Sequence, residues 1–483
     1  MNGFNMNTKS EARFQCLASQ AGFSLIELMI AVTLGLIITT ALAALFLNIS
    51  RTNDEMTKTN SQIENGRFTM QLLQEDIIHA GFWGPYNVQF NDPTYVTTPL
   101  DAPTAVPNPC LLYSTPWSAT DVVNLIGINI QTYGATPPAG TGCVTNLATN
   151  KQSNTDVLVV RHAETCAPGE TNCEAHTAGK LYFQASQCED EITSQAQAGS
   201  ATSITLSTSS SATTNFYVGR TVRILAGGGL GQARLITAYN GTSKVATVSP
   251  AWDTTAPATV PDINSIYSFG FGYLLDTSGF TTLHKRNCTT VAEKRKFISN
   301  IYYVRDYAKT VGDGIPTLML SSFDLAGGAL KHQEAQPLIE GIEGFQVELG
   351  IDNLSKAGAN IIINADPTML YTNRVRWDSL ASPTSSLTAD DDFTKPLNRG
   401  DGVPDAFVKC TDATPCDFKQ LSNVVAVKLY VLARADKVSP GYTDTKTYAL
   451  GSTTLGPYND GFKRHVFSTT VRVNNVSSRR ETP

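Results

Sequence analysis

The first hydrophobic feature of the chain is a long apolar run near its start. The run covers about residues 23–47, and Glu27 is its only charged residue. At about 1.5 Å per residue, an α-helix of this length spans the roughly 30 Å hydrocarbon core of a membrane. The run therefore predicts a transmembrane helix. Lys9 and Arg13 form a basic flank before it, so we expect the residues after the helix to face outward.

The apolar pattern becomes periodic after the run. Single apolar residues recur every seven positions, and others join them toward residue 80, so a thin stripe becomes a broad one. The stripe consists of Ile49, Met56, Ile63, Met70 and Ile77, widened by Phe68, Leu72, Leu73 and Ile78. Gly81 and Pro85 are stop signals for a helix. We therefore predict one spine helix over residues 23–80, whose second half packs on a sheet; a coiled-coil stem is the alternative.

The remainder of the chain alternates between apolar and polar residues as β-strands do. The clearest segments are residues 156–161, 301–305, 345–349, 424–432 and 467–473. The aromatic residues Phe82, Trp83 and Tyr86 follow the helix, and we expect them in the core where helix and sheet meet. A long helix followed by many strands predicts an α+β protein with an antiparallel sheet.

Residues 200–268 differ from their surroundings. They are rich in Ser and Thr and then form short β-type runs, and Asn240 and Gly241 lie between two of these runs as in a β-hairpin turn. We interpret the segment as an inserted small β-domain. It divides the head into residues 81–199 and 269–476 and leaves residues 477–483 as a tail.

The nine cysteines indicate an oxidising compartment. Cys16 precedes the apolar run, the other eight follow it, and no Cys-x-x-Cys pair or zinc-type Cys/His spacing occurs. Buried free thiols are the alternative. The short spacings favour two disulfides that each close a local loop. A third disulfide would close the base of the inserted domain, and the two remaining cysteines would form the fourth. The hypothesis is Cys166–Cys173, Cys410–Cys416, Cys188–Cys288 and Cys110–Cys143.

Glu27 distinguishes three interpretations of the apolar run. These are a plain signal anchor, a secretory signal cleaved after Ala41-Leu42-Ala43, and a prepilin leader. A carboxylate within the membrane costs about 3 kcal/mol, and neither of the first two interpretations gives it a role.

The sequence Gly22-Phe23-Ser24-Leu25-Ile26-Glu27 resembles the class III signal of type IV prepilins. The resemblance implies that residues 1–22 are a leader, which a prepilin peptidase removes between Gly22 and Phe23. It also implies that Phe23 is N-methylated. Within or between subunits, the Phe23 amine and the Glu27 carboxylate would neutralise each other, because a buried unpaired charge is costly, and this pairing would set the register of neighbours.

Later segments resemble the PilW family of minor pilins. They are residues 156–161, the stretch from Leu338 to Asp352, and the ending over residues 466–474. The resemblance implies a pilin-like fold and a structural subunit that primes or caps a type IV pilus near its tip. The subunit would lie in the inner membrane with a periplasmic head, then in the extracellular filament. Its expected partners are other minor pilins, the major pilin, the prepilin peptidase and the assembly machinery.

Two other functions within this class stay open. A type II secretion pseudopilin is one, although such proteins are usually shorter. The other is a tip adhesin that binds through the inserted domain. The sequence does not indicate whether the filament serves twitching motility, DNA uptake or cell adhesion.

No motif predicts an enzyme or a cofactor. The glycine-rich segment at residues 227–231 lacks the Lys-Ser/Thr of a phosphate loop, and the six histidines are scattered. The net charge of −6 has no basic block, so no nucleic-acid partner is expected. An exported enzyme would need cleavage near Ala43 and a catalytic cluster. Acidic residues beside a glycine turn are a weak calcium candidate against a solvated loop: Asp390, Asp392, Asp401 and Asp405.

Overall fold

The computed structural model describes most of the chain between residues 24 and 481. The residues left out within this range are 94–98, 100, 114–116, 144–146, 148, 172, 189–192, 219, 231, 255–258, 270–271, 282, 374 and 380–390. The chain divides into two compact units, residues 1–58 and residues 59–483, and each is described by itself.

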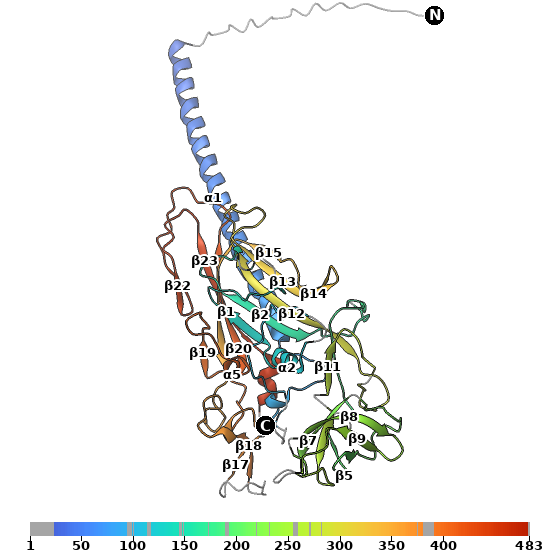
Figure 1. The fold of residues 1–483 in the computed structure, drawn as a ribbon. Coiled ribbons are helices and arrows are strands. Elements are labelled where there is room, and N and C mark those ends of the chain that lie inside the picture. Colours follow the sequence, from blue (N-terminus) through green and yellow to red (C-terminus); the bar gives the residue numbers. More distant parts are fainter. Residues whose placement is uncertain are drawn as a thin grey trace, which may run out of the picture. The chain divides into compact units, whose positions relative to one another are not determined.

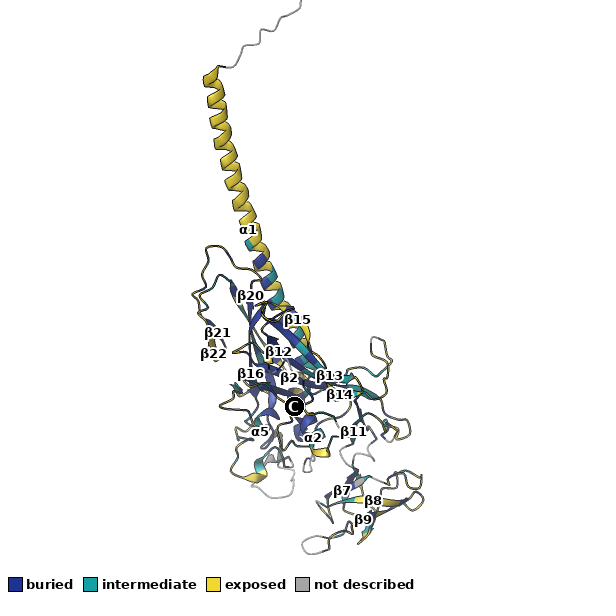
Figure 2. Cartoon of the chain, turned by 45° about the horizontal axis from the view of Figure 1, so that its top comes forward, coloured by how far each residue is buried: buried dark blue, intermediate teal, exposed yellow. Residues whose placement is uncertain are grey.

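The first unit consists, in its described part, of the start of helix α1 (Leu25–His79). Every residue from Ser24 to Asp54 is exposed, as the yellow colour of this part of α1 shows (Figure 2). By length and composition, α1 is a helix that could cross a membrane. The spine helix predicted over residues 23–80 is therefore present as a single α-helix.

The second unit contains two antiparallel sheets that form the head (Figure 1). The eight-stranded sheet follows the order β1-β2-β12-β13-β14, with β15 also on β13, β3 also on β12, and β11 on β3. Its strands are β1 (Ile130–Tyr133), β2 (Val157–Ala163), β3 (Tyr182–Ala185), β11 (Tyr273–Asp276), β12 (Lys294–Arg305), β13 (Thr317–Ala326), β14 (Ala329–His332) and β15 (Gln336–Glu340).

The four-stranded sheet follows the order β19-β16-β20-β23. Its central strand β16 is buried along its whole length and β20 along most of its length, so both of their faces are covered. The strands are β16 (Ile342–Ile351), β19 (Ala406–Val408), β20 (Val424–Arg434) and β23 (Arg464–Arg472). Two small hairpins accompany it, β17 (Trp377–Ser379) with β18 (Asp391–Pro396) and β21 (Tyr448–Leu450) with β22 (Thr453–Leu455).

Short helices connect these strands. Helix α2 begins after Ser118, whose side chain and that of Asp121 form a reciprocal capping box. The helices are α2 (Ala119–Gly127), α5 (Phe418–Leu421) and α6 (Asn474–Arg480), with the 3-10 turns η1 (Gln89–Asn91) and η2 (Pro367–Met369). The tail predicted from residue 477 is wrong, because Ser477 and Arg480 of α6 are buried.

The main core joins the second half of α1 to both sheets. The apolar stripe of the helix supplies Leu73 and Ile77, both with no exposed surface. They pack in one cluster with residues of β2, β16 and β20 such as Leu158, Val347 and Val427. This is the packing that the widening stripe predicts, because a broad apolar face is buried only against another apolar face.

The inserted segment forms a small barrel with its own core. Its seven strands follow the order β4-β10-β7-β8-β9-β6-β5, and only Ala196 and Gln197 separate the two end strands along the chain. The ends of the sheet are therefore brought together, and aromatic residues such as Tyr217, Tyr239 and Trp252 fill the interior. The strands are β4 (Ser194–Gln195), β5 (Ala198–Ser200), β6 (Ser203–Thr205), β7 (Thr221–Ala226), β8 (Ala233–Asn240), β9 (Val245–Ser249) and β10 (Ile266–Phe269).

The expected fold class is confirmed. The molecule is α+β, with a long apolar N-terminal helix, and every strand pairing in the described residues is antiparallel. Each of the five predicted strand segments overlaps an observed strand, namely β2, β12, β16, β20 and β23. The predicted hairpin at Asn240 and Gly241 joins β8 to β9.

Candidate assembly site

The start of α1 holds Glu27 in a local hydrogen-bond pair. Its carboxylate accepts from the backbone N–H of Ser24 at 3.0 Å, and its own N–H donates to the Ser24 hydroxyl at 3.2 Å. This is a capping box, which satisfies two of the free N–H groups at a helix start. The Ser-x-x-Glu pattern in the sequence is the signal for this cap, which the prediction of a docking role for Glu27 did not include. Gly22 and Phe23 lie outside the described residues.

The second half of α1 is fixed to the head by polar side chains as well as by its apolar face. The side-chain amide of Gln62 donates to the carbonyl of Ala433 at 2.6 Å, and that of Asn65 donates to Glu340 at 3.1 Å. These bonds connect the helix to the end of β20 and to β15. Since they are specific in position, they fix how far the helix is advanced along the sheet.

Asp76 is the centre of a third polar contact between α1 and the eight-stranded sheet. Its carboxylate accepts from Asn300 Nδ2 at 3.1 Å and from the Tyr302 hydroxyl at 2.9 Å, and it lies 2.9 Å from His162 Nε2. Burial, and then the charge of Asp76, raises the pKa of Tyr302 well above its usual range, so this hydroxyl keeps its proton. The network satisfies side chains that would otherwise be buried without partners.

Helix α6 closes the other end of α1. The side chain of Asn475 donates to the carbonyls of Ile78, His79 and Ala80 at 3.2, 3.3 and 3.2 Å. The last carbonyl groups of a helix have no partner within it, so this amide acts as a C-terminal cap. The end of the chain and the end of the spine helix are thereby joined.

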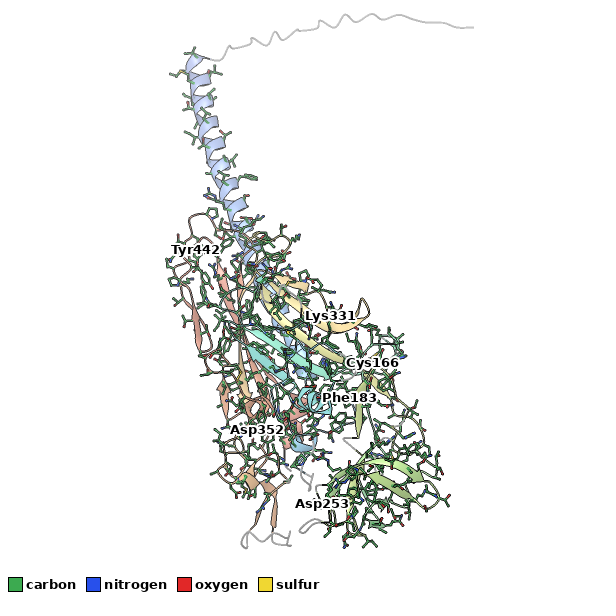
Figure 3. The ribbon with its side chains drawn as sticks, in the orientation of Figure 1. Cys166, Phe183, Asp253, Lys331, Asp352 and Tyr442 are labelled. Atoms are coloured by element: carbon green, nitrogen blue, oxygen red, sulfur yellow. A yellow bond between two sulfur atoms is a disulfide. The ribbon has the colours of Figure 1, made fainter. Side chains whose placement is uncertain are left out.

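Asp352 anchors α6 from the opposite side. It has no exposed surface, and its carboxylate accepts from the N–H of Gly402 at 3.0 Å and from Arg480 Nη1 at 3.1 Å (Figure 3). Burial raises the pKa of Asp352 to about 6, against the lowering effect of Arg480. A side chain at Gly400 would overlap the carboxylate, so only glycine fits there.

A second buried ionic cluster surrounds Arg464 at the start of β23. Its guanidinium, with no exposed surface, contacts Glu343, Asp444 at 2.9 Å and Asp460 at 2.6 Å. Hydrogen bonding to Arg464 lowers the pKa of Asp460. The cluster ties the segment between β20 and β23 to β16. Removing the arginine would leave buried carboxylates uncompensated, which is strongly destabilising.

Four disulfides link loops of the head. They are the four pairs of the sequence-based hypothesis, Cys110–Cys143, Cys166–Cys173, Cys188–Cys288 and Cys410–Cys416. The bridge between Cys188 and Cys288 brackets the barrel, because its cysteines lie before β4 and after β10. It closes the loop that contains the whole insertion.

The acidic segment is not gathered into a metal site in the residues described. Asp390 lies outside them, and Asp392 belongs to β18. The carboxylate of Asp401 accepts from the N–H of Val403, and that of Asp405 accepts from Asn353 and Leu354 at 2.9 and 2.8 Å. Among described residues, no group of three or more His, Cys, Asp or Glu side chains is placed to hold a metal ion. The calcium hypothesis stays a prediction.

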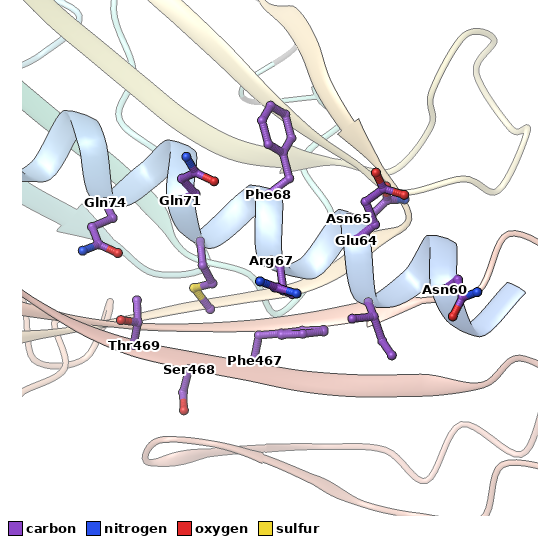
Figure 4. Close-up of a pocket in the computed structure, with 12 residues that line it drawn as sticks. Asn60, Glu64, Asn65, Arg67, Phe68, Gln71, Gln74, Phe467, Ser468 and Thr469 are labelled. Atoms are coloured by element: carbon purple, nitrogen blue, oxygen red, sulfur yellow. The ribbon is translucent and has the colours of Figure 1, made fainter. Parts of the chain in front are cut away.

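The remaining candidate is an open groove between α1 and β23 (Figure 4). Its volume is about 1040 Å³, and helix residues from Asn60 to Gln74 form one side while Phe467, Ser468 and Thr469 form the other. Arg67 points from the helix toward Phe467, whereas Phe68 points away from β23. Gly66 makes this close approach possible, because a Cβ there would overlap the ring of Phe467.

Comparison with known proteins bears on both ends of the chain. Residues 301–475 match the family described as type IV pilus-assembly protein W, PilW. The resemblance to PilW is confirmed. The PilW match contains the whole four-stranded sheet, Asp352 and the Arg464 cluster, and it excludes the barrel. Residues 17–43 match the prokaryotic N-terminal methylation motif, which includes Gly22, Phe23 and Glu27.

The other two comparisons add little to the evidence from the PilW match. No curated protein matches the sequence significantly. Among solved structures, a type IV-like pilin from Thermus thermophilus is 16% identical, over 37% of this chain and 69% of that one, with a TM-score of 0.16. The PilW and methylation-motif matches support a type IV pilus-related pilin, anchored in a membrane and structural rather than enzymatic in its role.

Proposed function

We propose that this protein is a minor pilin that primes or caps a type IV pilus near its tip. A prepilin peptidase cleaves between Gly22 and Phe23, and Phe23 is then N-methylated. The inner-membrane assembly machinery moves the processed subunit into the filament, where it contacts other minor pilins and the major pilin. The observation that carries the proposal is a methylation motif on an apolar helix whose second half is fixed to a PilW-type head.

The geometry of Glu27 suggests how the subunit tolerates a carboxylate in the membrane. Before assembly, the Ser24 N–H and the positive end of the helix dipole stabilise the charge. After cleavage, the Phe23 amine competes for the same carboxylate, from the same subunit or from a neighbour. An ion pair in an apolar bundle is strong only when it is well aligned, so this exchange would set the axial position of one subunit against the next.

In this proposal the head needs no cofactor. Its buried carboxylates form ion pairs with buried arginines, as Asp352 does with Arg480 and Glu343 with Arg464. Its disulfides suit the periplasm, where thiols are oxidised. Calcium bound by the acidic segment is the alternative, and chelation would lower the thermal midpoint of the head only in that case.

Mass spectrometry of the mature N-terminus tests the proposal directly. In membranes and in sheared pili, we expect the chain to begin at N-methylated Phe23. Glu27→Ala should still be cleaved but be lost from the pilus fraction by tenfold or more. Glu75→Ala, which removes an exposed carboxylate farther along α1 and outside the groove between α1 and β23, should leave pilus incorporation unchanged. A mature start near residue 44 would instead indicate ordinary secretion and would exclude the proposal.

A second function, adhesion through the barrel, is favoured by one observation. The barrel has its own aromatic core and lies within the loop closed by Cys188–Cys288, so it is built as a separate module on the head. If it is the binding module of a tip adhesin, deletion of Ser194–Phe269 with both cysteines kept should preserve pili and abolish surface attachment. Loss of pili in the same deletion would make the barrel structural.

A further inference from the structure

Strand β23 forms one edge of the four-stranded sheet. It pairs with β20 over nine residues without a shift in register, and no other strand in the described residues pairs with it. At about 3.3 Å per residue, this edge is about 30 Å long. Natural sheets usually protect such edges with short strands, bulges, proline or lysine. The sequence of β23, Arg464–Arg472, contains neither proline nor lysine.

The alternation of hydrogen-bonded residues along β23 shows which of its backbone groups face away from β20. Just beyond its two ends, the N–H of Ala435 donates to Lys463 at 2.9 Å and the N–H of Val473 donates to Val425 at 2.8 Å. Hydrogen-bonded pairs alternate along an antiparallel ladder. Odd-numbered residues of β23 therefore bond to β20, and the even-numbered ones direct their N–H and C=O groups away from the sheet. The exposed residues among these include Ser468 and Thr470.

The groove of Figure 4 lies beside this edge, on the side of α1. Side chains of a strand alternate between faces, so a strand added next to β23 would place every second side chain in the groove. Ile63, which is 39% exposed, and the ring of Phe467 offer apolar surface there. A partner strand would thus gain both backbone hydrogen bonds and apolar burial, which are the two components of strand addition.

The charges on the groove and the edge indicate what this partner carries. Arg67 is exposed in the groove and forms no ion pair with any described residue, and His465 is exposed near the start of β23. Arg472, exposed at the other end of the strand, is already paired with Glu481. A second β23 strand would bring His465 and Arg472 but no acidic residue, so it offers no carboxylate to Arg67. A second copy of this chain is therefore disfavoured, and acidic side chains are favoured.

We propose that β23 is a docking edge for an extended strand of a different pilus subunit, with acidic residues near Arg67 and His465. The strand extends the four-stranded sheet and places its apolar side chains against Ile63 and Phe467. The proposal rests on the proposed pilin function and names the surface through which the head contacts its neighbour.

The test uses the full chain in cells that make the other pilus subunits. The photo-crosslinking residue p-benzoylphenylalanine replaces Ser468, and the crosslinked peptide is sequenced. We expect it to come from an extended segment of a different pilus subunit. The same probe at Ala449, an exposed residue of β21, should give at most a tenth of that yield.

Two matched pairs of variants test the recognition. Thr470→Pro removes an N–H group that faces away from the sheet and leaves the hydrogen bonds to β20 in place. Thr470→Ala keeps this N–H group. Arg67→Glu reverses the charge in the groove, and Lys446→Glu does so on an exposed loop. Thr470→Pro and Arg67→Glu should each lower the crosslink at least tenfold, and their controls should not. If protease resistance shows that Thr470→Pro unfolds the head, the Arg67 pair decides.

The outcomes separate this inference from the proposed function. A chain that lacks N-methylated Phe23 and is absent from pili contradicts the proposed function itself. Normal processing and incorporation with no Ser468 crosslink contradict only the docking edge. A crosslink to a second copy of the chain, or equal yields with Thr470→Pro and Thr470→Ala, also overturn the docking proposal.

Discussion

The two halves of α1 have the same backbone conformation and different surroundings. Leu34 in the first half is 54% exposed, whereas Leu73 in the second half has no exposed surface. Both halves belong to one continuous α-helix, so the pattern of backbone hydrogen bonds is the same in both. Only the second half has an apolar partner within its own chain. The first half exposes an apolar surface that a membrane or the helices of neighbouring subunits would have to cover.

The largest expected difference between the two halves of α1 is in the free energy of unfolding when one leucine in each half is replaced by alanine. Leu73→Ala should lower the free energy of unfolding of the head by about 3–5 kcal/mol, because it leaves a cavity in the main core. Leu34→Ala removes the same atoms from an exposed position and should change it by less than about 0.5 kcal/mol. Chemical denaturation in detergent, followed by tryptophan fluorescence to which the buried Trp83 contributes, measures both. Equal effects would mean that the second half does not pack as the structure shows.

A smaller effect, up to about 3 kcal/mol, is expected from pH and only in the head. Asp101 is fully buried beside the turn that follows α1, and burial raises its pKa to about 6. Its unfolded pKa is about 3.9, so the folded head binds the proton more tightly. This stabilisation is fully present below about pH 4 and is lost as the pH rises through about 6.

Comparison with Asp101→Asn isolates this contribution. The variant carries no charge at any pH, and its amide oxygen still accepts from Tyr86 or Gln89. Between pH 4 and 6, the difference in thermal midpoint between the two proteins should therefore change steadily in favour of the variant. A difference that is constant over this range would show that Asp101 keeps its usual pKa.

The smallest effect comes from the glycines of α1. Gly66→Ala should destabilise the head by about 1–2 kcal/mol, because the new Cβ overlaps the Phe467 ring and the ring must move. At Gly35, no atom lies within 4 Å of the place that a Cβ would occupy, so Gly35→Ala should leave the head unchanged and favour the helix.

A double variant shows whether the Phe467 ring causes the loss. Combining Gly66→Ala with Phe467→Ala should cost less than the sum of the single changes, since the ring is no longer there to be displaced. Chemical denaturation of the four proteins gives this coupling. Additive costs would place the strain elsewhere than at β23.

Local patterns predicted the elements of the fold well. The spine helix and the segments now seen in β2, β12, β16, β20 and β23 follow from residue periodicity, which depends on neighbours along the chain. The short cysteine spacings likewise indicated Cys166–Cys173 and Cys410–Cys416. The hairpin at Asn240 followed from turn chemistry.

Contacts between distant residues were not predictable in the same way. No local signal indicates that Asp76 meets Tyr302, that Asn475 caps α1, or that Asp352 binds Arg480. Each of these side chains lies in an ordinary polar position of its own segment. Only their burial by other segments makes the pairing necessary, because a buried charge or donor without a partner is costly.

The sequence by itself determined that an apolar run with a single carboxylate lies near the start of the chain, that strands follow, and that its ends resemble those of pilins and PilW. These properties lie in short stretches of residues. The tertiary structure decided which face of α1 is buried, that the insertion closes into a barrel, and that β23 stands at an edge of its sheet. Strand order and burial result from contacts between segments far apart in the chain, so no single stretch of sequence contains them.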